Sequence, residues 1–261
     1  RLLTKTLRMH AKNLRLAKSK GESKEKLESM VENYMKAIYK ILTISLGTPP
    51  KTVDFEAVDK ENHFISHKNL SPNQFFENFV SMNLDDYISL INAPTKDKPY
   101  YKREEVKYVN VPIEVFKKVI LAQLKDKEPV WFGCDVLQNF YRKGSSHFDF
   151  STLRLDELFG MDIDFSKEDR LDYKESLMTH AMVFMGCDYD EEKNLIKRYK
   201  VENSWGEDAG NKGYFVMSDA WFDEYVYQVL IHKKHLEPTI LAAYEEEAIK
   251  LEPWDPMGSL A

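Results

Sequence analysis

The chain has 261 residues and a net charge of −6, from 37 basic and 43 acidic side chains, with 43% hydrophobic and 13% aromatic residues. This composition excludes an intrinsically disordered chain, and two cysteines exclude a disulfide scaffold and favour a reducing compartment, so we expect a cytoplasmic protein. No apolar run approaches the roughly 18 residues of a membrane span and no secretory leader is present, so we expect no membrane partner. The first residue is Arg1 rather than Met, and we expect a piece of a longer protein.

The first forty residues are basic and predict two helices. They carry eleven basic and four acidic side chains, a net charge of +7. Five of the basic residues recur every three or four positions, which places them on one face of a helix: Arg1, Lys5, Arg8, Lys12 and Arg15. This basic stripe is either a solvated helix face or a binding site for a polyanion such as nucleic acid. A second helix is predicted over about 23–45, ended by Gly47 and the prolines after it.

Further along the chain, strands become more frequent than helices. Residues 51–70 are predicted to be extended, and Ser71 followed by Pro72 predicts the N-cap and first turn of a short helix. Another helix is predicted from Pro112 to the residues before Pro129. Strands are predicted at 106–109, 130–134, 181–189, 195–203, 213–217 and 225–232, with a last helix at about 238–248. Helices first and strands later favour an α+β fold over alternating α/β units.

The most informative segment lies between residues 176 and 217. His180 precedes an apolar run at 181–185, and 23 residues later Asn203 opens the string N-S-W-G-E-D-A-G-N-K-G-Y. One interpretation is a hydrogen-bonded core histidine and an asparagine in a turn. However, the string resembles the asparagine segment of papain-like cysteine peptidases, and the run after His180 resembles their histidine strand. The sequence departs from that pattern at Ala209, where these peptidases usually carry an aromatic residue.

The chemistry of such peptidases explains why these residue types are needed. A thiol attacks a peptide carbonyl efficiently as a thiolate, which a neighbouring imidazole generates by taking its proton. The resemblance implies that His180 is this general base and later the acid, and that Asn203 orients its ring. It also implies that Trp205 shields the hydrogen bond between them from water.

Longer strings narrow the resemblance to the bleomycin hydrolase family. They occur at 175–182, 201–208, 221–227 and 254–261. This resemblance implies the barrel-like half of the papain-like fold with a helical insertion and a C-terminal tail, in a homohexameric cysteine aminopeptidase. Such an enzyme removes N-terminal residues from peptides with a free N-terminus by acyl transfer through a thioester. The expected regions are a helical oligomerisation region, the barrel half with the catalytic residues, and the last helix with the tail, at 1–100, 101–235 and 236–261.

The nucleophile that this family requires is not recognisable in the chain. Cys134 lies in a strand-like run and Cys187 follows the histidine strand, and neither has the flanks of a thiolate at a helix N-terminus. We therefore expect both to be structural. The nucleophilic cysteine is expected in a missing N-terminal half, so this chain alone is predicted to be inactive.

The carboxyl end is the second feature that the resemblance interprets. It implies that the tail enters the active-site cleft and that the carboxylate of Ala261 anchors the substrate's free amine. Without the resemblance, a frayed terminus is the ordinary expectation. The alternative for the whole chain is a non-catalytic oligomeric scaffold or nucleic-acid-binding protein that retains the papain-like half. No cofactor and no metal are expected, since His63 and His67 are spaced like ligands but lack a third.

Overall fold

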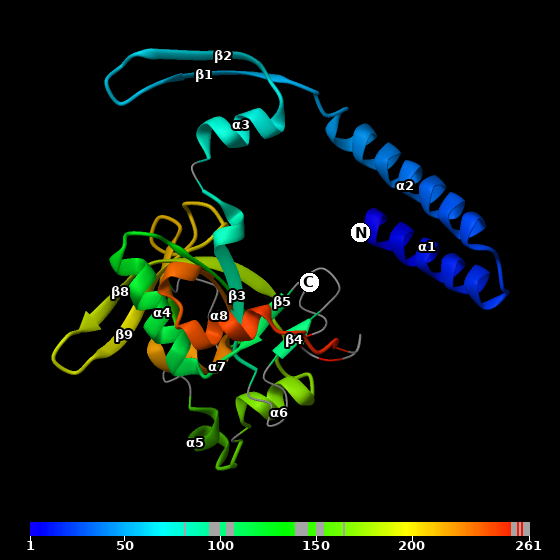
Figure 1. Ribbon diagram of the computed structural model, residues 1–261. Coiled ribbons are helices and arrows are strands. Elements are labelled where there is room, and N and C mark those ends of the chain that lie inside the picture. Colours follow the sequence, from blue (N-terminus) through cyan, green and yellow to red (C-terminus); the bar gives the residue numbers. More distant parts are fainter. Residues whose placement is uncertain are drawn as a thin grey trace. The chain divides into compact units, whose positions relative to one another are not determined.

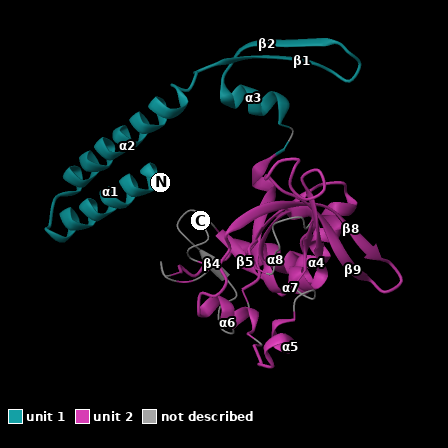
Figure 2. Cartoon of the chain, turned by 180° about the vertical axis from the view of Figure 1, so that it is seen from behind, with its two compact units in different colours: residues 1–82 teal, residues 83–261 magenta. Residues whose placement is uncertain are grey.

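The computed structural model describes residues 1–80, 82–93, 100–102, 107–138, 146–149, 154–163, 165–251, 255 and 257. The chain divides into two compact units, Arg1–Met82 and Asn83–Ala261, coloured separately in Figure 2. Each unit is described by itself.

The first unit opens with the two predicted helices, α1 (Leu2–Ser19) and α2 (Lys24–Leu46), which pack against each other (Figure 1). Their contact includes His10, which is buried and whose ring stacks on Tyr34 with centroids 3.9 Å apart. The side chain of Ser23 caps α2 by accepting a hydrogen bond from the Lys26 backbone N–H. Within the described part of the chain, no helix is long and apolar enough to cross a membrane.

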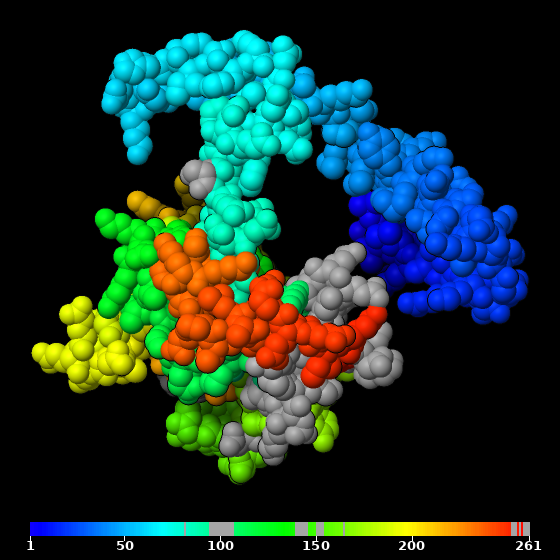
Figure 3. Space-filling model, viewed as in Figure 1, coloured from blue at the N-terminus to red at the C-terminus, as the bar shows by residue number. Residues whose placement is uncertain are grey.

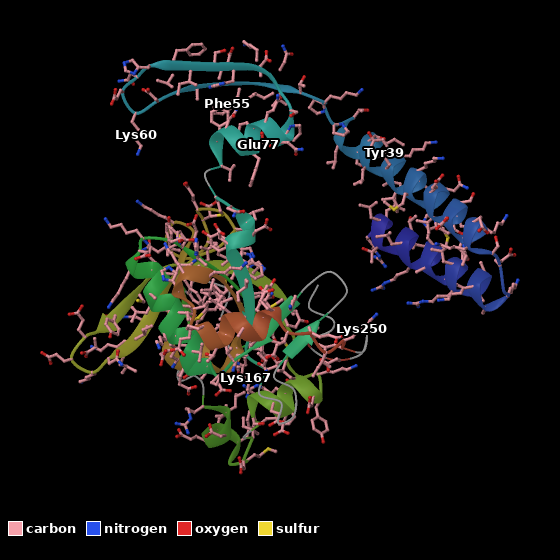
Figure 4. All side chains as sticks on the ribbon, viewed as in Figure 1. Tyr39, Phe55, Lys60, Glu77, Lys167 and Lys250 are labelled. Atoms are coloured by element: carbon pink, nitrogen blue, oxygen red, sulfur yellow. The ribbon has the colours of Figure 1, made fainter. Side chains whose placement is uncertain are left out.

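The rest of the first unit is a β-hairpin followed by a short helix. Strands β1 (Val53–Val58) and β2 (Phe64–Leu70) are antiparallel, and α3 (Pro72–Phe79) begins with a capping box formed by Ser71 and Gln74. Phe55 of β1 points toward α3 (Figure 4), where its ring lies 5.2 Å from Phe75 and 4.6 Å from Phe79. The Ser71-Pro72 prediction is therefore confirmed, and an aromatic cluster fastens α3 to the hairpin.

The second unit is built on a nine-stranded sheet in the order β4-β5-β3-β11-β6-β8-β9-β10-β7. The pairs β3–β5 and β7–β10 are parallel, and the other neighbours are antiparallel. The strands are β3 (Tyr87–Ile91), β4 (Tyr100–Lys102), β5 (Lys107–Asn110), β6 (Val130–Cys134), β7 (His147–Phe148), β8 (His180–Asp190), β9 (Leu195–Glu202), β10 (Tyr214–Ser218) and β11 (Val226–His232).

Helices connect and cover these strands. They are α4 (Ile113–Lys125), α5 (Leu155–Phe159), α6 (Lys167–Asp172), α7 (Asp219–Tyr225) and α8 (Pro238–Glu245), with short 3-10 turns at Leu84–Asp86 and Lys233–His235. The core lies between the sheet and α4 and α7, where Phe132 of β6 stacks on Phe184 of β8 at 3.8 Å and Trp221 of α7 is fully buried. Figure 3 shows α8, in orange-red, on the surface of this unit. These helices and the large sheet confirm the expected α+β class.

Six elements of the second unit were not predicted from the sequence, namely β3, β4, β7, α5, α6 and α7. Strand β3 was not predicted, although it pairs with β5 and β11, so the sheet begins well before residue 101. Helix α7 also interrupts a stretch predicted to be mostly strand. It begins because the Ser218 side chain accepts from the Trp221 N–H, and it buries Trp221, Phe222 and Tyr225 against the sheet.

Candidate active site

His180 is the first residue of β8, at the point where an irregular segment enters the sheet. β8 pairs with β6 in a register that places His180 opposite Cys134, the last residue of β6. The imidazole is half-buried. Its position therefore depends on the β6–β8 ladder on one side and on the segment before it on the other.

Asn203 follows the last residue of β9 and opens a tight loop that returns to β10. Its N–H donates to the Gly213 carbonyl at 3.1 Å, which closes the loop on itself. Gly210 has a φ of +63°, and a Cβ on it would lie 2.4 Å from the Tyr214 carbonyl oxygen. The loop therefore requires glycine at position 210, for its backbone conformation and for space.

The two side chains meet in a single hydrogen bond. His180 Nε2 lies 2.9 Å from Asn203 Oδ1, and the Ser204 N–H donates to the same Oδ1 at 2.8 Å. Because the Ser204 N–H can only donate, the shared atom is the amide oxygen, and His180 must donate to it through Nε2. In the neutral imidazole this leaves Nδ1 as the proton acceptor, the state that a general base requires.

Trp205 covers this hydrogen bond. Its ring stacks over the His180 ring, with centroids 5.2 Å apart and an interplanar angle of 23°, and meets Phe215 edge-on. Asn203 is only 9% exposed. A hydrogen bond removed from water in this way is held more firmly than one at the surface. The structure thus brings together His180, Asn203 and Trp205.

Neither cysteine is placed to act as the nucleophile. Cys134 is fully buried, and burial together with the charge of Asp135 raises the pKa of its thiol well above the usual value. Burial also raises the pKa of Cys187. Cys187 lines a hollow of about 640 Å³ that is formed by residues of β7, β8, β9 and β10. His180 is not among the residues that line it. Both thiols therefore stay protonated, which agrees with the structural roles expected for them.

The other predicted site residues are the basic stripe of the first unit and Ala261 at the end of the chain. The five residues of the basic stripe are all exposed, Arg1 as the N-cap of α1 and the other four within this helix. Ala261 lies outside the described residues. Earlier in the tail, Leu251 is buried, and Met257 is 3% exposed with its carbonyl accepting from the Tyr108 hydroxyl at 2.7 Å. Among the described residues no group of three or more His, Cys, Asp or Glu could hold a metal ion.

One residue near the site was not singled out from the sequence. Asp135 follows Cys134 and is buried, with its carboxylate bonded to the segment that leads into His180. Its position directly after an apolar strand was the available signal in the sequence. An acidic residue there is expected to be buried, and a buried carboxylate needs hydrogen-bond donors around it.

A histidine at the start of an interior strand that donates through Nε2 to an asparagine oxygen and is covered by a tryptophan is the arrangement by which papain-like cysteine peptidases orient a general base. The Peptidase C1-like family matches residues 1–258, and the chain belongs to this family. The predicted family resemblance is thereby confirmed.

Individual relatives agree with this assignment. The chain is 44% identical over 272 residues to aminopeptidase C of Listeria monocytogenes and 37% identical over 276 residues to bleomycin hydrolase of Gallus gallus, covering 100% of this chain and 60% of each relative. The crystal structure of PepW from Lactobacillus rhamnosis HN001 superposes with a TM-score of 0.90 at 42% identity, covering 100% of this chain and 61% of PepW. The papain-like fold is thus confirmed. The chain spans about three fifths of the length of these relatives.

Proposed function

We propose that this chain is the part of a cytoplasmic cysteine aminopeptidase that carries the catalytic histidine and asparagine. The hydrogen bond from His180 Nε2 to Asn203 Oδ1 carries the proposal, because it leaves Nδ1 free to take a proton from a thiol. The cysteine itself belongs to sequence upstream of this chain, which relatives of greater length support. The cytoplasmic location is supported by a composition with two unpaired cysteines.

In the proposed reaction His180 exchanges protons with the cysteine, the leaving amine and a water molecule in turn. Its Nδ1 accepts the thiol proton, and the thiolate forms a C–S bond to the carbonyl carbon of the peptide. The resulting imidazolium returns the proton to the leaving amine as the C–N bond breaks, which leaves a thioester. A water molecule then attacks the thioester carbonyl as His180 takes its proton; the C–S bond breaks, the acid is released, and His180 returns the proton to the cysteine sulfur. Asn203 keeps the ring oriented throughout, and Trp205 excludes water from that hydrogen bond.

The substrate class in this proposal is a peptide with a free N-terminus, whose ammonium group meets the carboxylate of Ala261. The described end of the chain supports a docked tail, because Leu251 and Met257 are buried in one apolar cluster that also contacts Met178, two residues before His180. Four further residues span at most about 14 Å. A fixed carboxylate would select an ammonium and block longer substrates.

A homohexamer belongs to the same proposal. The α1–α2 hairpin exposes large apolar side chains, among them Met9, Met35, Tyr39 and Ile44, and Tyr39 projects from α2 in Figure 4. Exposed large apolar side chains gathered on one helical hairpin are typical of contacts between subunits.

The test restores the upstream sequence and follows cleavage of peptides with free and acetylated N-termini. We expect turnover only of the free peptides, a loss of at least about 10³-fold on His180→Ala, and no effect of His63→Ala, which alters an exposed histidine of the β1–β2 hairpin. The 261-residue chain alone should show no turnover. Turnover by this chain, or an active His180→Ala variant, would show that the catalytic groups are misassigned.

The alternative function is a nucleic-acid-binding scaffold, which the exposure of all five stripe residues favours. Phosphate contacts by these side chains would make DNA binding fall steeply with salt. Alanine at Arg8, Lys12 and Arg15 together should then reduce binding of a DNA duplex at least tenfold, with Lys18, Lys20 and Lys24 as the control triple. Equal binding by both triple variants would remove this alternative.

A further inference from the structure

The segment that delivers His180 to the sheet has no regular secondary structure. Residues 175–179 lie between the end of α6 and the start of β8, and they form neither helix nor strand. A segment without the backbone hydrogen bonds of a helix or strand requires other hydrogen bonds to hold one conformation. Those bonds converge on a single carboxylate.

Asp135 accepts hydrogen bonds from three residues of this segment. Its Oδ2 accepts from the Ser176 hydroxyl at 2.9 Å and from the Leu177 N–H at 3.2 Å, and its Oδ1 accepts from the Thr179 hydroxyl at 3.1 Å. Gln138 Nε2 adds a fourth donor at 3.1 Å and also donates to the Glu175 carbonyl at 3.0 Å. Four donors, three from residues 176–179 and one from Gln138, thus surround the Asp135 carboxylate.

The chemistry of these partners requires a carboxylate. Asp135 is only 4% exposed, and Ser176 only 1%. An ionised carboxylate offers two oxygens that only accept, which suits four surrounding donors. An amide at this position would turn an NH₂ group toward donors and leave buried polar atoms unpaired.

The same strand end also fixes the position at which β8 begins. The Thr179 N–H donates to the Cys134 carbonyl at 3.0 Å, and Cys134 is the register partner of His180. Ser176 shares a second hydrogen bond, of 2.7 Å, with the hydroxyl of the fully buried Tyr227. The segment is therefore tied to the core at 176 and to β6 at 179, one residue before the imidazole.

We propose that Asp135 is a positioning residue for the catalytic histidine: by binding residues 176–179 it sets where β8 begins and so holds the His180 ring against Asn203. Asp135 does not touch the imidazole. The inference rests on the proposed function for the role of His180 in catalysis, but its structural content concerns only this chain.

The first measurement is the exchange with water of the His180 Nε2 proton, followed by NMR in the 261-residue chain. The wild-type proton should exchange slowly because it is bonded to Asn203 and covered by Trp205. Asp135→Asn should speed exchange at least about tenfold, whereas Asp172→Asn, which alters an exposed carboxylate of α6, should leave it unchanged.

Two matched variants of Thr179 test the inference in case Asp135→Asn does not fold. Thr179→Val keeps the shape but removes the hydroxyl, and we expect exchange about threefold faster. Thr179→Ser keeps the donor and should retain the wild-type rate. Wild-type rates in a folded Asp135→Asn variant or in Thr179→Val would overturn the inference, as would a wild-type chain whose Nε2 proton exchanges as fast as a solvent-exposed imidazole.

The second measurement uses the longer polypeptide with its nucleophile. Displacement of the ring should lower kcat by about 10²-fold in Asp135→Asn with little change in KM, because peptide binding does not require the proton acceptor. A rise in KM with unchanged kcat would overturn the inference. An inactive wild-type enzyme would instead contradict the proposed function, while the exchange measurement would still decide the role of Asp135.

Discussion

At the scale of single residues, the side-chain oxygen of Asn203 determines the chemistry available to His180. It accepts from both the imidazole and the Ser204 N–H, so its orientation is fixed before any substrate arrives. The Asn203 Nδ2 group is buried and has no hydrogen-bond partner among the described residues. The oxygen therefore has the positioning role in this amide, and the nitrogen does not.

This asymmetry predicts different outcomes for two substitutions of Asn203 in the longer enzyme. Asn203→Ala removes the acceptor and should lower kcat by about 10²-fold. Asn203→Asp keeps an acceptor, loses only the unpartnered nitrogen and adds a charge that favours the imidazolium, so it should retain more activity than Asn203→Ala. Steady-state kinetics with a free N-terminal peptide compare them. Equal activity of the two variants would contradict the role given to the oxygen.

Lys167, labelled in Figure 4, shows how burial affects a charge outside the site. Its Nζ donates to Asn92 Oδ1 and to the carbonyls of Asp223 and Val226, each at 2.8 Å. Burial lowers its pKa to about 7, although Glu224 and Asp223 favour the charged form. The ammonium ties α6 to the ends of β3 and α7 and to the start of β11.

The depressed pKa predicts a pH-dependent stability. Below about pH 7 both the folded and the unfolded chain bind the proton, so the group adds no pH dependence. Between about pH 7 and the ordinary lysine pKa of 10.5, only the unfolded chain keeps this proton. The free energy of unfolding should therefore rise by roughly 1 kcal/mol per pH unit in that range. The measurement is the difference in unfolding free energy between wild type and Lys167→Met from pH 6 to 9. A constant difference would show that the folded chain keeps its ammonium charged.

At the scale of elements, the loop after Asn203 is stabilised by glycines with different requirements. Gly206 and Gly210 both have positive φ, +87° and +63°, but a Cβ on Gly206 would meet nothing within 4 Å. Gly210 is confined by the Tyr214 carbonyl and the Phe215 ring. Backbone conformation alone restricts the first position, and conformation together with space restricts the second.

The comparison predicts unequal costs for alanine at these two positions. Gly206→Ala should lower the unfolding free energy by about 1 kcal/mol, the usual cost of the left-handed region for a residue with a Cβ. Gly210→Ala adds a clash with backbone atoms that cannot move aside and should cost at least about 2 kcal/mol more. Denaturant unfolding of the two variants measures the difference. Similar costs would mean that the loop relaxes around the new methyl group.

At the scale of the whole molecule, the two units differ in how many side chains they bury. Among the described residues of the first unit, only His10, Ile38 and Leu70 are buried, whereas the second unit holds the large cluster around Phe132 and Phe184. Local opening is easiest where few apolar contacts oppose it. The first unit should therefore open locally more readily than the second.

Hydrogen exchange tests this difference. In dilute solution the amides of α1 and α2 should exchange at least about 10²-fold faster than those of β8 and β11. If the exposed apolar side chains of α2 form subunit contacts, protection of both helices should increase with protein concentration. Equal protection of both units in a monomeric sample would contradict this account.

Local signals in the sequence were sufficient to predict the start of α3 and the end of α2 and to single out the candidate pair His180 and Asn203. Ser71 with Pro72 predicted α3, and Gly47 ended α2 as expected, because capping and φ preferences act within a few residues. His180 and Asn203 were recognised because a twelve-residue string around Asn203 carries the family pattern. Strand β3 was not predicted, since its partners β5 and β11 are distant in the sequence, and helix α7 was missed although its Ser218 cap is local.

The sequence by itself was enough to single out His180 and Asn203 as the candidate pair and to predict structural roles for both cysteines. Only the tertiary structure decided that Oδ1 of Asn203, and not its nitrogen, faces His180, and that Asp135 binds a segment more than forty residues further along the chain. The reason is physical. Periodicity and capping report interactions between near neighbours, whereas a buried carboxylate is explained only by donors that folding brings to it.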